Sequence, residues 1–132
     1  MDTRSTHLLV ELWDADRAVL ESVPEVREVL HEAARKARVT VVHSAFHGFN
    51  PAGVSGVVVL AESHITIHTW PEEGYAAADI FTCGDEAMPD LAAQHLAEGL
   101  GARRVEVTRV VRGVPRGARQ CGFRLPSSPR FV

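Results

Sequence analysis

Two consecutive stretches in the middle of the chain carry different patterns of hydrophobic residues. Residues 54–61, VSGVVVLA, form a short run of mainly β-branched apolar residues, which predicts a strand buried on both faces. Along residues 63–70, SHITIHTW, apolar side chains alternate with a second set of side chains. One face of a second strand is therefore apolar, and the other carries His64, His68 and Trp70. The alternation predicts a core face and a face that is free to form a site.

Proline and glycine mark the ends of further elements. Residues 75–83 follow Pro71 and Gly74 and are again strand-like, which places Cys83 at a strand end, just before Gly84. Three more strands are predicted at residues 7–13, 39–46 and 103–111. Turns are predicted at residues 14–17 and 47–51.

Two amphipathic helices complete the pattern. Ser22 is a predicted N-cap with Glu25 three residues later, and apolar residues then recur at helical spacing as far as Ala37. The second helix is expected to begin near Met88 and to stop at Gly101. Each helix has one apolar side, so each is expected to cover a face of a sheet.

Length and composition narrow the class of protein. A chain of 132 residues with 45% hydrophobic and 23% charged residues is typical of a single soluble domain, and its small size favours an oligomer. The net charge of -3 gives no reason to expect a nucleic acid partner. No run approaches the ~18 apolar residues of a membrane span and the N-terminus does not resemble a signal peptide, so a cytoplasmic protein without membrane contact is expected. Cys83 and Cys121 are then expected to be reduced thiols.

Reactive side chains gather around the junction of the two central strands. At Glu62-Ser63, a serine hydroxyl lies next to a carbonyl carbon, and such a hydroxyl can attack its own peptide bond in a constrained turn. His68 is either a half-buried strand histidine or a group for proton transfer, to which its near-neutral titration is suited. Ser55 is either a small residue in a tight strand or part of the same site.

The remaining candidates also have two interpretations each. Cys83 is a small buried hydrophobic residue or a partly exposed reactive thiol. Glu72 is a solvated carboxylate in a turn or an acceptor for two vicinal hydroxyl groups. Phe49 anchors a loop or offers a ring for stacking. Glu11 is an outward-facing carboxylate or lies near the substrate.

Histidine spacing does not predict a metal site. His64 and His68 are four residues apart, as are His43 and His47. On a helix this spacing suits zinc, but on a strand it separates the two side chains by roughly 13 Å. One ion cannot bridge that distance, so no metal is expected.

The composite of ESH at residues 62–64, HTWPE at 68–72 and FTCG at 81–84 resembles the short prokaryotic S-adenosylmethionine decarboxylases. The resemblance covers roughly residues 7–112. It implies that a proenzyme cuts itself between Glu62 and Ser63, giving a β chain of residues 1–62 and an α chain of residues 63–132. Ser63 would become a covalent pyruvoyl group, the cofactor, and would form a Schiff base with the substrate amine.

The resemblance also implies a role for each of the other candidates. His68 and Ser55 would assist the self-cleavage, and Cys83 would be the proton donor in decarboxylation. Phe49 and His68 would stack on the adenine of S-adenosylmethionine, and Glu72 would bind its ribose. The product would be the aminopropyl donor for spermidine and other polyamines.

The implied fold is α+β: an antiparallel sheet with helices on one face, dimerising into a four-layer αββα sandwich. Residues 1–112 would form the single domain, and residues 113–132, which include Cys121, a C-terminal tail outside the family pattern. Glu73 and Gly48 depart from that pattern, which leaves the substrate open. The alternative is a pyruvoyl-dependent decarboxylase of free arginine or ornithine.

Overall fold

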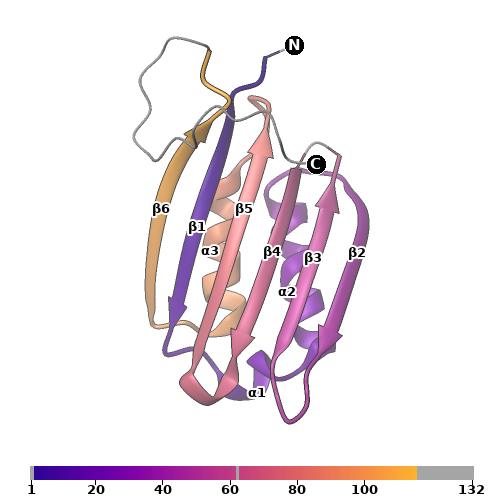
Figure 1. Ribbon diagram of the computed structural model, residues 1–132, viewed down its shortest axis with the longest axis vertical. Helices are drawn as coiled ribbons and strands as arrows, with labels where there is room; N and C mark the ends of the chain where they lie inside the picture. Colours follow the sequence, from indigo (N-terminus) through magenta and orange to yellow (C-terminus); the bar gives the residue numbers. More distant parts are fainter. Residues whose placement is uncertain (1, 62, 116–132) are drawn as a thin grey trace, which may run out of the picture.

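A single antiparallel sheet forms the frame of the protein (Figure 1). The computed structural model describes residues 2–61 and 63–115. Within them six strands lie in the order β2-β3-β4-β5-β1-β6, and every neighbouring pair is antiparallel. The strands are β1 (Ser5–Trp13), β2 (Val41–Gly48), β3 (Val54–Leu60), β4 (Ser63–Trp70), β5 (Tyr75–Cys83) and β6 (Arg104–Arg112).

The helices lie on one face of this sheet (Figure 1). They are α1 (Arg17–Leu20), α2 (Val23–Lys36) and α3 (Pro89–Leu100), with a short 3-10 turn η1 (Pro71–Glu73) after β4. Helix α2 contacts β2 and β3, and α3 contacts β1 and β5. The protein therefore has two layers, and the predicted antiparallel sheet with helices on one face is confirmed.

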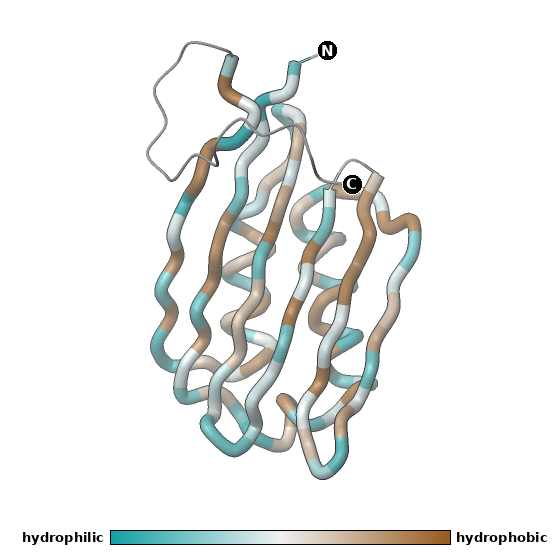
Figure 2. The backbone as a smooth tube through the Cα atoms, viewed as in Figure 1, coloured by the Kyte–Doolittle hydropathy of each residue, from teal (hydrophilic) through white to brown (hydrophobic). Residues whose placement is uncertain are grey.

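The hydrophobic core fills the space between the helices and the sheet. Alternate residues of β1 and β4 are buried there, and Figure 2 shows the matching alternation in hydropathy along the strands. The core residues include Leu8, Val10, Leu12, Leu30, Ile65, Ile80, Leu96 and Leu100. The residues between them point to the opposite face, which we call the open face. Its strand residues include His7, Leu9, Glu11, His64, His68 and Asp79.

Local sequence signals set several element boundaries. Ser22 Oγ accepts a hydrogen bond from the Glu25 N–H at the start of α2, as predicted. Gly101 ends α3 with a φ of 67°, a left-handed conformation that glycine adopts without steric cost. The strands predicted at residues 63–70 and 75–83 have those bounds in the structure.

Three sequence predictions were wrong in detail. The strand β3 is not buried on both faces: Val59 is 37% exposed, because the helices cover only one side. The turn predicted at residues 14–17 leads into the short helix α1, which Asp16 caps by accepting from the Ala18 N–H. Strand β2 runs on to Gly48 and so includes His47, which the prediction placed in a turn.

The described part of the chain does not reach every predicted feature. None of its helices is long and apolar enough to cross a membrane. Glu62 and residues 116–132 lie outside the described residues, so the first residue of the cleavage junction and Cys121 in the tail stay sequence predictions.

Candidate active site

Ser63 and Cys83 lie at the same end of the sheet. Ser63 is the first residue of β4 and Cys83 the last residue of the neighbouring strand β5. Both are half-buried and line one cleft of about 340 Å³, together with Gly84 and Asp85. The pairing of β4 with β5 thus brings a hydroxyl and a free thiol to one cleft, as the two strand ends in the sequence suggested.

Ser55 and His68 form a second pair on the open face. They are register partners in β3 and β4, and Ser55 Oγ lies 2.6 Å from His68 Nδ1. If the hydroxyl accepts from Nδ1–H, the Nε2 lone pair is left free as a base; if it donates, Nε2 carries the proton. Both side chains line a groove of about 750 Å³ on the open face. The pair has the chemistry needed to move a proton.

The structure does not bring these two pairs together within one chain. Ser63 and His68 are five residues apart on a straight strand, which corresponds to roughly 16 Å between their Cα atoms. Strand length, and not the small number of residues between them, sets the distance between Ser63 and His68. In a single chain His68 cannot contact the Ser63 hydroxyl.

The two predicted substrate-binding residues lie at the His68 end of β4. Phe49 is 45% exposed, and its ring centroid is 5.6 Å from that of His68. The loop after β2 therefore presents an aromatic face to the solvent beside the histidine. Glu72 is exposed in the η1 turn that follows Trp70 directly. Ser55, His68, Phe49 and Glu72 thus form one group, and Ser63 and Cys83 form another.

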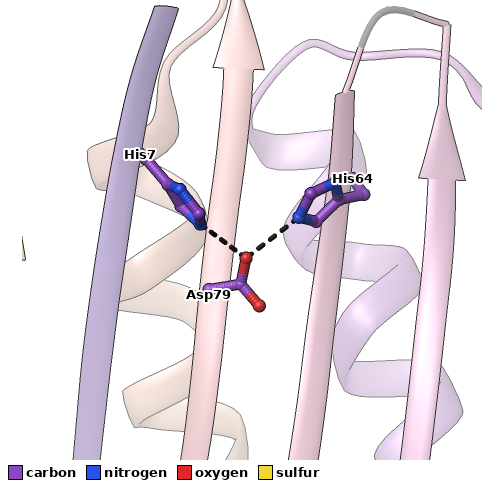
Figure 3. Close-up of side chains that lie close together, drawn as sticks. All are labelled: His7, His64 and Asp79. Carbon is purple, nitrogen blue, oxygen red and sulfur yellow. Dashed lines mark hydrogen bonds and ion pairs between the residues drawn. The ribbon is translucent and has the colours of Figure 1, made fainter. Parts of the chain in front are cut away.

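A third cluster on the open face was missed in the sequence (Figure 3). His7 Nε2 and His64 Nε2 lie 2.6 Å and 2.9 Å from the same Asp79 oxygen, and Thr66 donates to the other oxygen. Partial burial raises the pKa of Asp79, but the hydrogen bonds from Thr66, His7 and His64 outweigh burial and lower that pKa. Three strands contribute these residues, so no local spacing in the sequence could signal the cluster.

The protonation of this cluster argues against a metal ion. The donor atoms of His7, His64 and Asp79 lie within 4.8 Å of one another, a spacing that a metal site would also show. However, the Arg112 guanidinium lies 3.4 Å from His7 Nδ1 and can only donate to it. In the tautomer that satisfies both contacts, His7 carries its proton on Nε2 and donates it to Asp79, and a metal ion at Nε2 would have to displace that proton. The cluster fits a hydrogen-bonded carboxylate.

Glu11 also has a partner that the sequence did not reveal. The Tyr75 hydroxyl donates to Glu11 Oε2 at 2.5 Å across β5 and β1. Burial and this bond to a carboxylate raise the pKa of Tyr75 to about 12. The sequence left Glu11 as an outward-facing carboxylate or a residue near the substrate. The structure adds a third role, in which the Glu11 carboxylate orients the Tyr75 ring.

The fold matches that of a decarboxylase of known structure. The crystal structure of the adenosylmethionine decarboxylase from Aquifex aeolicus superposes with a TM-score of 0.80 at 34% identity, covering 92% of this chain and 100% of that one. The family model for S-adenosylmethionine decarboxylase matches residues 6–113. The chain belongs to the S-adenosylmethionine decarboxylase family.

Two bacterial relatives support the same assignment. The S-adenosylmethionine decarboxylase proenzyme of Thermodesulfovibrio yellowstonii is 47% identical over 109 residues, which are 83% of this chain and 81% of that protein. The proenzyme of Thermotoga maritima is 49% identical over 113 residues, 86% of this chain and 87% of that protein.

Proposed function

We propose that this chain is a proenzyme that cuts itself between Glu62 and Ser63 and then decarboxylates S-adenosylmethionine. The observation that carries the proposal is the shared cleft of Ser63 and Cys83, in a chain that is nearly half identical to named proenzymes over most of its length. The hydroxyl is the source of the pyruvoyl group, and the thiol lies where a proton is needed afterwards. The residues therefore fit the cofactor that the family requires.

The self-cleavage follows from ordinary serine chemistry. Ser63 Oγ attacks the Glu62 carbonyl carbon, the peptide C–N bond breaks, and an ester forms in its place. Loss of the Cα proton of residue 63 then expels the Glu62 carboxylate and leaves dehydroalanine. Tautomerisation to an imine and addition of water release ammonia and leave the pyruvoyl ketone. His68, with Nδ1 held by Ser55, supplies the base for the proton transfers.

The distance between Ser63 and His68 requires a second copy of the chain. Two open faces packed together with their strands in opposite directions bring each His68 to the Ser63 end of the partner. The same packing covers exposed apolar residues of the open face, such as Leu9 and Val59, and builds a four-layer αββα dimer. Each active site then contains Ser63 and Cys83 from one copy and Ser55 and His68 from the other.

The exposed groups beside His68 suit a nucleoside substrate. Phe49 stacks on the adenine together with His68, and the Glu72 carboxylate accepts from the two ribose hydroxyls. Once formed, the pyruvoyl group would supply an electron sink for the electron pair that remains on the substrate carbon when the carboxylate leaves as CO2. Cys83 then donates the proton to the substrate carbon. Free arginine and ornithine have neither an adenine for Phe49 to stack on nor a ribose for Glu72 to bind. The names of the relatives also favour S-adenosylmethionine as the substrate. The product would serve as an aminopropyl donor in polyamine synthesis.

Intact mass and CO2 release test the proposal together. The purified chain should separate under denaturing conditions into fragments of residues 1–62 and 63–132, and Ser63→Ala should remain whole. The cleaved protein should release CO2 from S-adenosylmethionine and not from arginine or ornithine. A chain that stays whole after long incubation would remove the pyruvoyl mechanism, and release from a free amino acid alone would change the substrate.

A further inference from the structure

Every tryptophan and the single tyrosine of the chain lie in one row on the open face. The ring centroids of Trp13 and Tyr75 are 4.2 Å apart and those of Tyr75 and Trp70 are 5.2 Å apart, with near-parallel planes in both cases. Trp70 then lies 4.3 Å from the ring of His68. We call Trp13, Tyr75 and Trp70 the aromatic row. It runs from β1 through β5 to His68 on β4.

Strand β1 holds the outer end of this row. Tyr75 is fixed at its hydroxyl by Glu11 and across its ring by Trp13, and both of these residues come from β1. The Arg104 guanidinium lies over the Trp13 ring, 5.3 Å from its centroid. Tyr75 is also the register partner of Trp70 at the β4–β5 turn. The tyrosine thus connects the interior strand β1 to the last residue of β4.

His68 needs such support for proton transfer. Ser55 fixes the position of Nδ1 at 2.6 Å, but a single hydrogen bond leaves the imidazole free to rotate about it. Ring contacts restrict that rotation: the Phe49 ring centroid lies 5.6 Å from that of His68, and the Trp70 ring centroid lies 4.3 Å from it. Trp70 is itself 37% exposed at a strand end, so its own orientation depends on stacking with Tyr75.

We propose that Tyr75, anchored by Glu11 and Trp13, is a positioning residue for His68 and acts through Trp70. This inference rests on the proposed role of His68 in self-cleavage. Removing the Tyr75 ring frees Trp70 and lets the imidazole sample orientations in which Nε2 does not meet the reacting group. Removing only the hydroxyl keeps the stacked rings and has a smaller effect.

The test compares Tyr75→Leu with Tyr75→Phe, and uses Phe81→Leu as a matched control. Phe81 lies on the same strand and face as Tyr75 but packs against the rings of His7 and His64. Each variant is also made with Ser63→Ala, so that the uncleaved chain can be studied by NMR. The His68 ring signals are assigned by their loss in His68→Gln. Tyr75→Leu should shift these signals and alter their pH titration, whereas Tyr75→Phe and Phe81→Leu should leave them nearly unchanged.

Self-cleavage kinetics with Ser63 present supply the second measurement. Tyr75→Leu should slow the appearance of the two fragments by about threefold to tenfold, the size of one aromatic stacking contact, and Tyr75→Phe by less. Unchanged His68 signals in Tyr75→Leu would overturn the inference. Shifted signals with an unchanged cleavage rate would support positioning but overturn the proposed role of His68 in cleavage. The two failures are therefore distinguishable.

Discussion

Ser55 and His68 face each other across β3 and β4, with Ser55 Oγ 2.6 Å from His68 Nδ1. The hydrogen bond occupies Nδ1 of the imidazole and leaves Nε2 available for proton transfer. Ser63, which this chemistry must serve, starts the strand on which His68 lies. In the proposed dimer, this hydrogen-bonded pair would act on the Ser63 of the other copy of the chain.

Mixed dimers should reveal this sharing of sites. Alone, Ser63→Ala lacks the attacking hydroxyl and His68→Ala lacks the base, so both should remain whole or nearly so. When the two are co-expressed, a mixed dimer has one site with Ser63 from the His68→Ala chain and His68 from the Ser63→Ala chain. We expect up to half of the chains in mixed dimers to be cleaved, all of them His68→Ala chains, as identified by mass. An absence of fragments despite proven mixed dimers would show that each site lies within one chain.

Substitution of Cys83 should separate the two reactions. In Cys83→Ala the Ser63 hydroxyl and the Ser55–His68 pair are unchanged, so the two fragments should form at a rate close to that of the wild type. The step after CO2 loss then lacks its proton donor, and kcat should fall about a hundredfold or more. Fragment formation and CO2 release, measured on the same preparation, decide the matter. A folded Cys83→Ala protein that does not cleave would assign the thiol to processing.

Glu72 should affect the substrate and not the self-cleavage. The charged hydrogen bonds from the Glu72 carboxylate to the ribose are worth ~1.5 to 3 kcal/mol each, and Glu72→Gln replaces them by weaker neutral ones. The kcat/KM for S-adenosylmethionine should therefore fall roughly tenfold to a hundredfold. Glu73→Gln, one residue further in the same turn, is the matched control and should stay near the wild-type value. Equal losses in both variants would indicate a general effect of the turn's charge.

Tyr75 can be titrated directly because it is the single tyrosine of the chain. Phenolate absorbance in the near ultraviolet should show a pKa of about 12 in the folded protein, above the ordinary value of 10.0. Because the pKa of Tyr75 is higher in the folded protein than in the unfolded chain, its protonated hydroxyl contributes to the stability of the fold. This contribution is complete below pH ~10 and is lost as the pH rises through the folded pKa. Glu11→Gln should lower the pKa of Tyr75, because the neutral amide no longer opposes formation of the phenolate. An unshifted titration in Glu11→Gln would show that the carboxylate does not contact the hydroxyl in solution.

The Asp79 cluster should make stability depend on acid pH. The pKa of Asp79 is lowered in the folded state, so its contribution is present above pH ~4 and is lost as the pH falls through the folded pKa. Asp79→Asn in the uncleavable Ser63→Ala background should cost about 1 to 3 kcal/mol at neutral pH. Denaturant unfolding at a series of pH values should show this difference shrinking below pH ~4. A difference that is constant with pH would mean that the carboxylate charge does not stabilise the fold.

The sequence by itself predicted most of the secondary-structure elements and placed Ser63 and Cys83 at strand ends. Alternation at residues 63–70 and 75–83 and the N-cap at Ser22 act over a few residues, so local pattern predicted their bounds correctly. Cys83 was predicted correctly at a strand end just before Gly84, and the antiparallel pairing of β4 with β5 places that end beside the start of β4. The composite motif indicated the S-adenosylmethionine decarboxylase family, which the family model over residues 6–113 confirms, and the roles of the motif residues stay predictions.

Only the tertiary structure decided which side chains meet across strands that are distant in sequence. The His7–Asp79–His64 cluster and the Glu11–Tyr75 bond depend on β1 lying beside β5, and their residues are up to 72 positions apart in the sequence. The length of β4 likewise decided that Ser63 and His68 are neighbours in sequence but not in space. Strand geometry separates residues by about 3.3 Å per position whatever their chemistry, and sheet register then sets their partners. A motif gives the identity of reactive residues, but the sheet sets the distances between them.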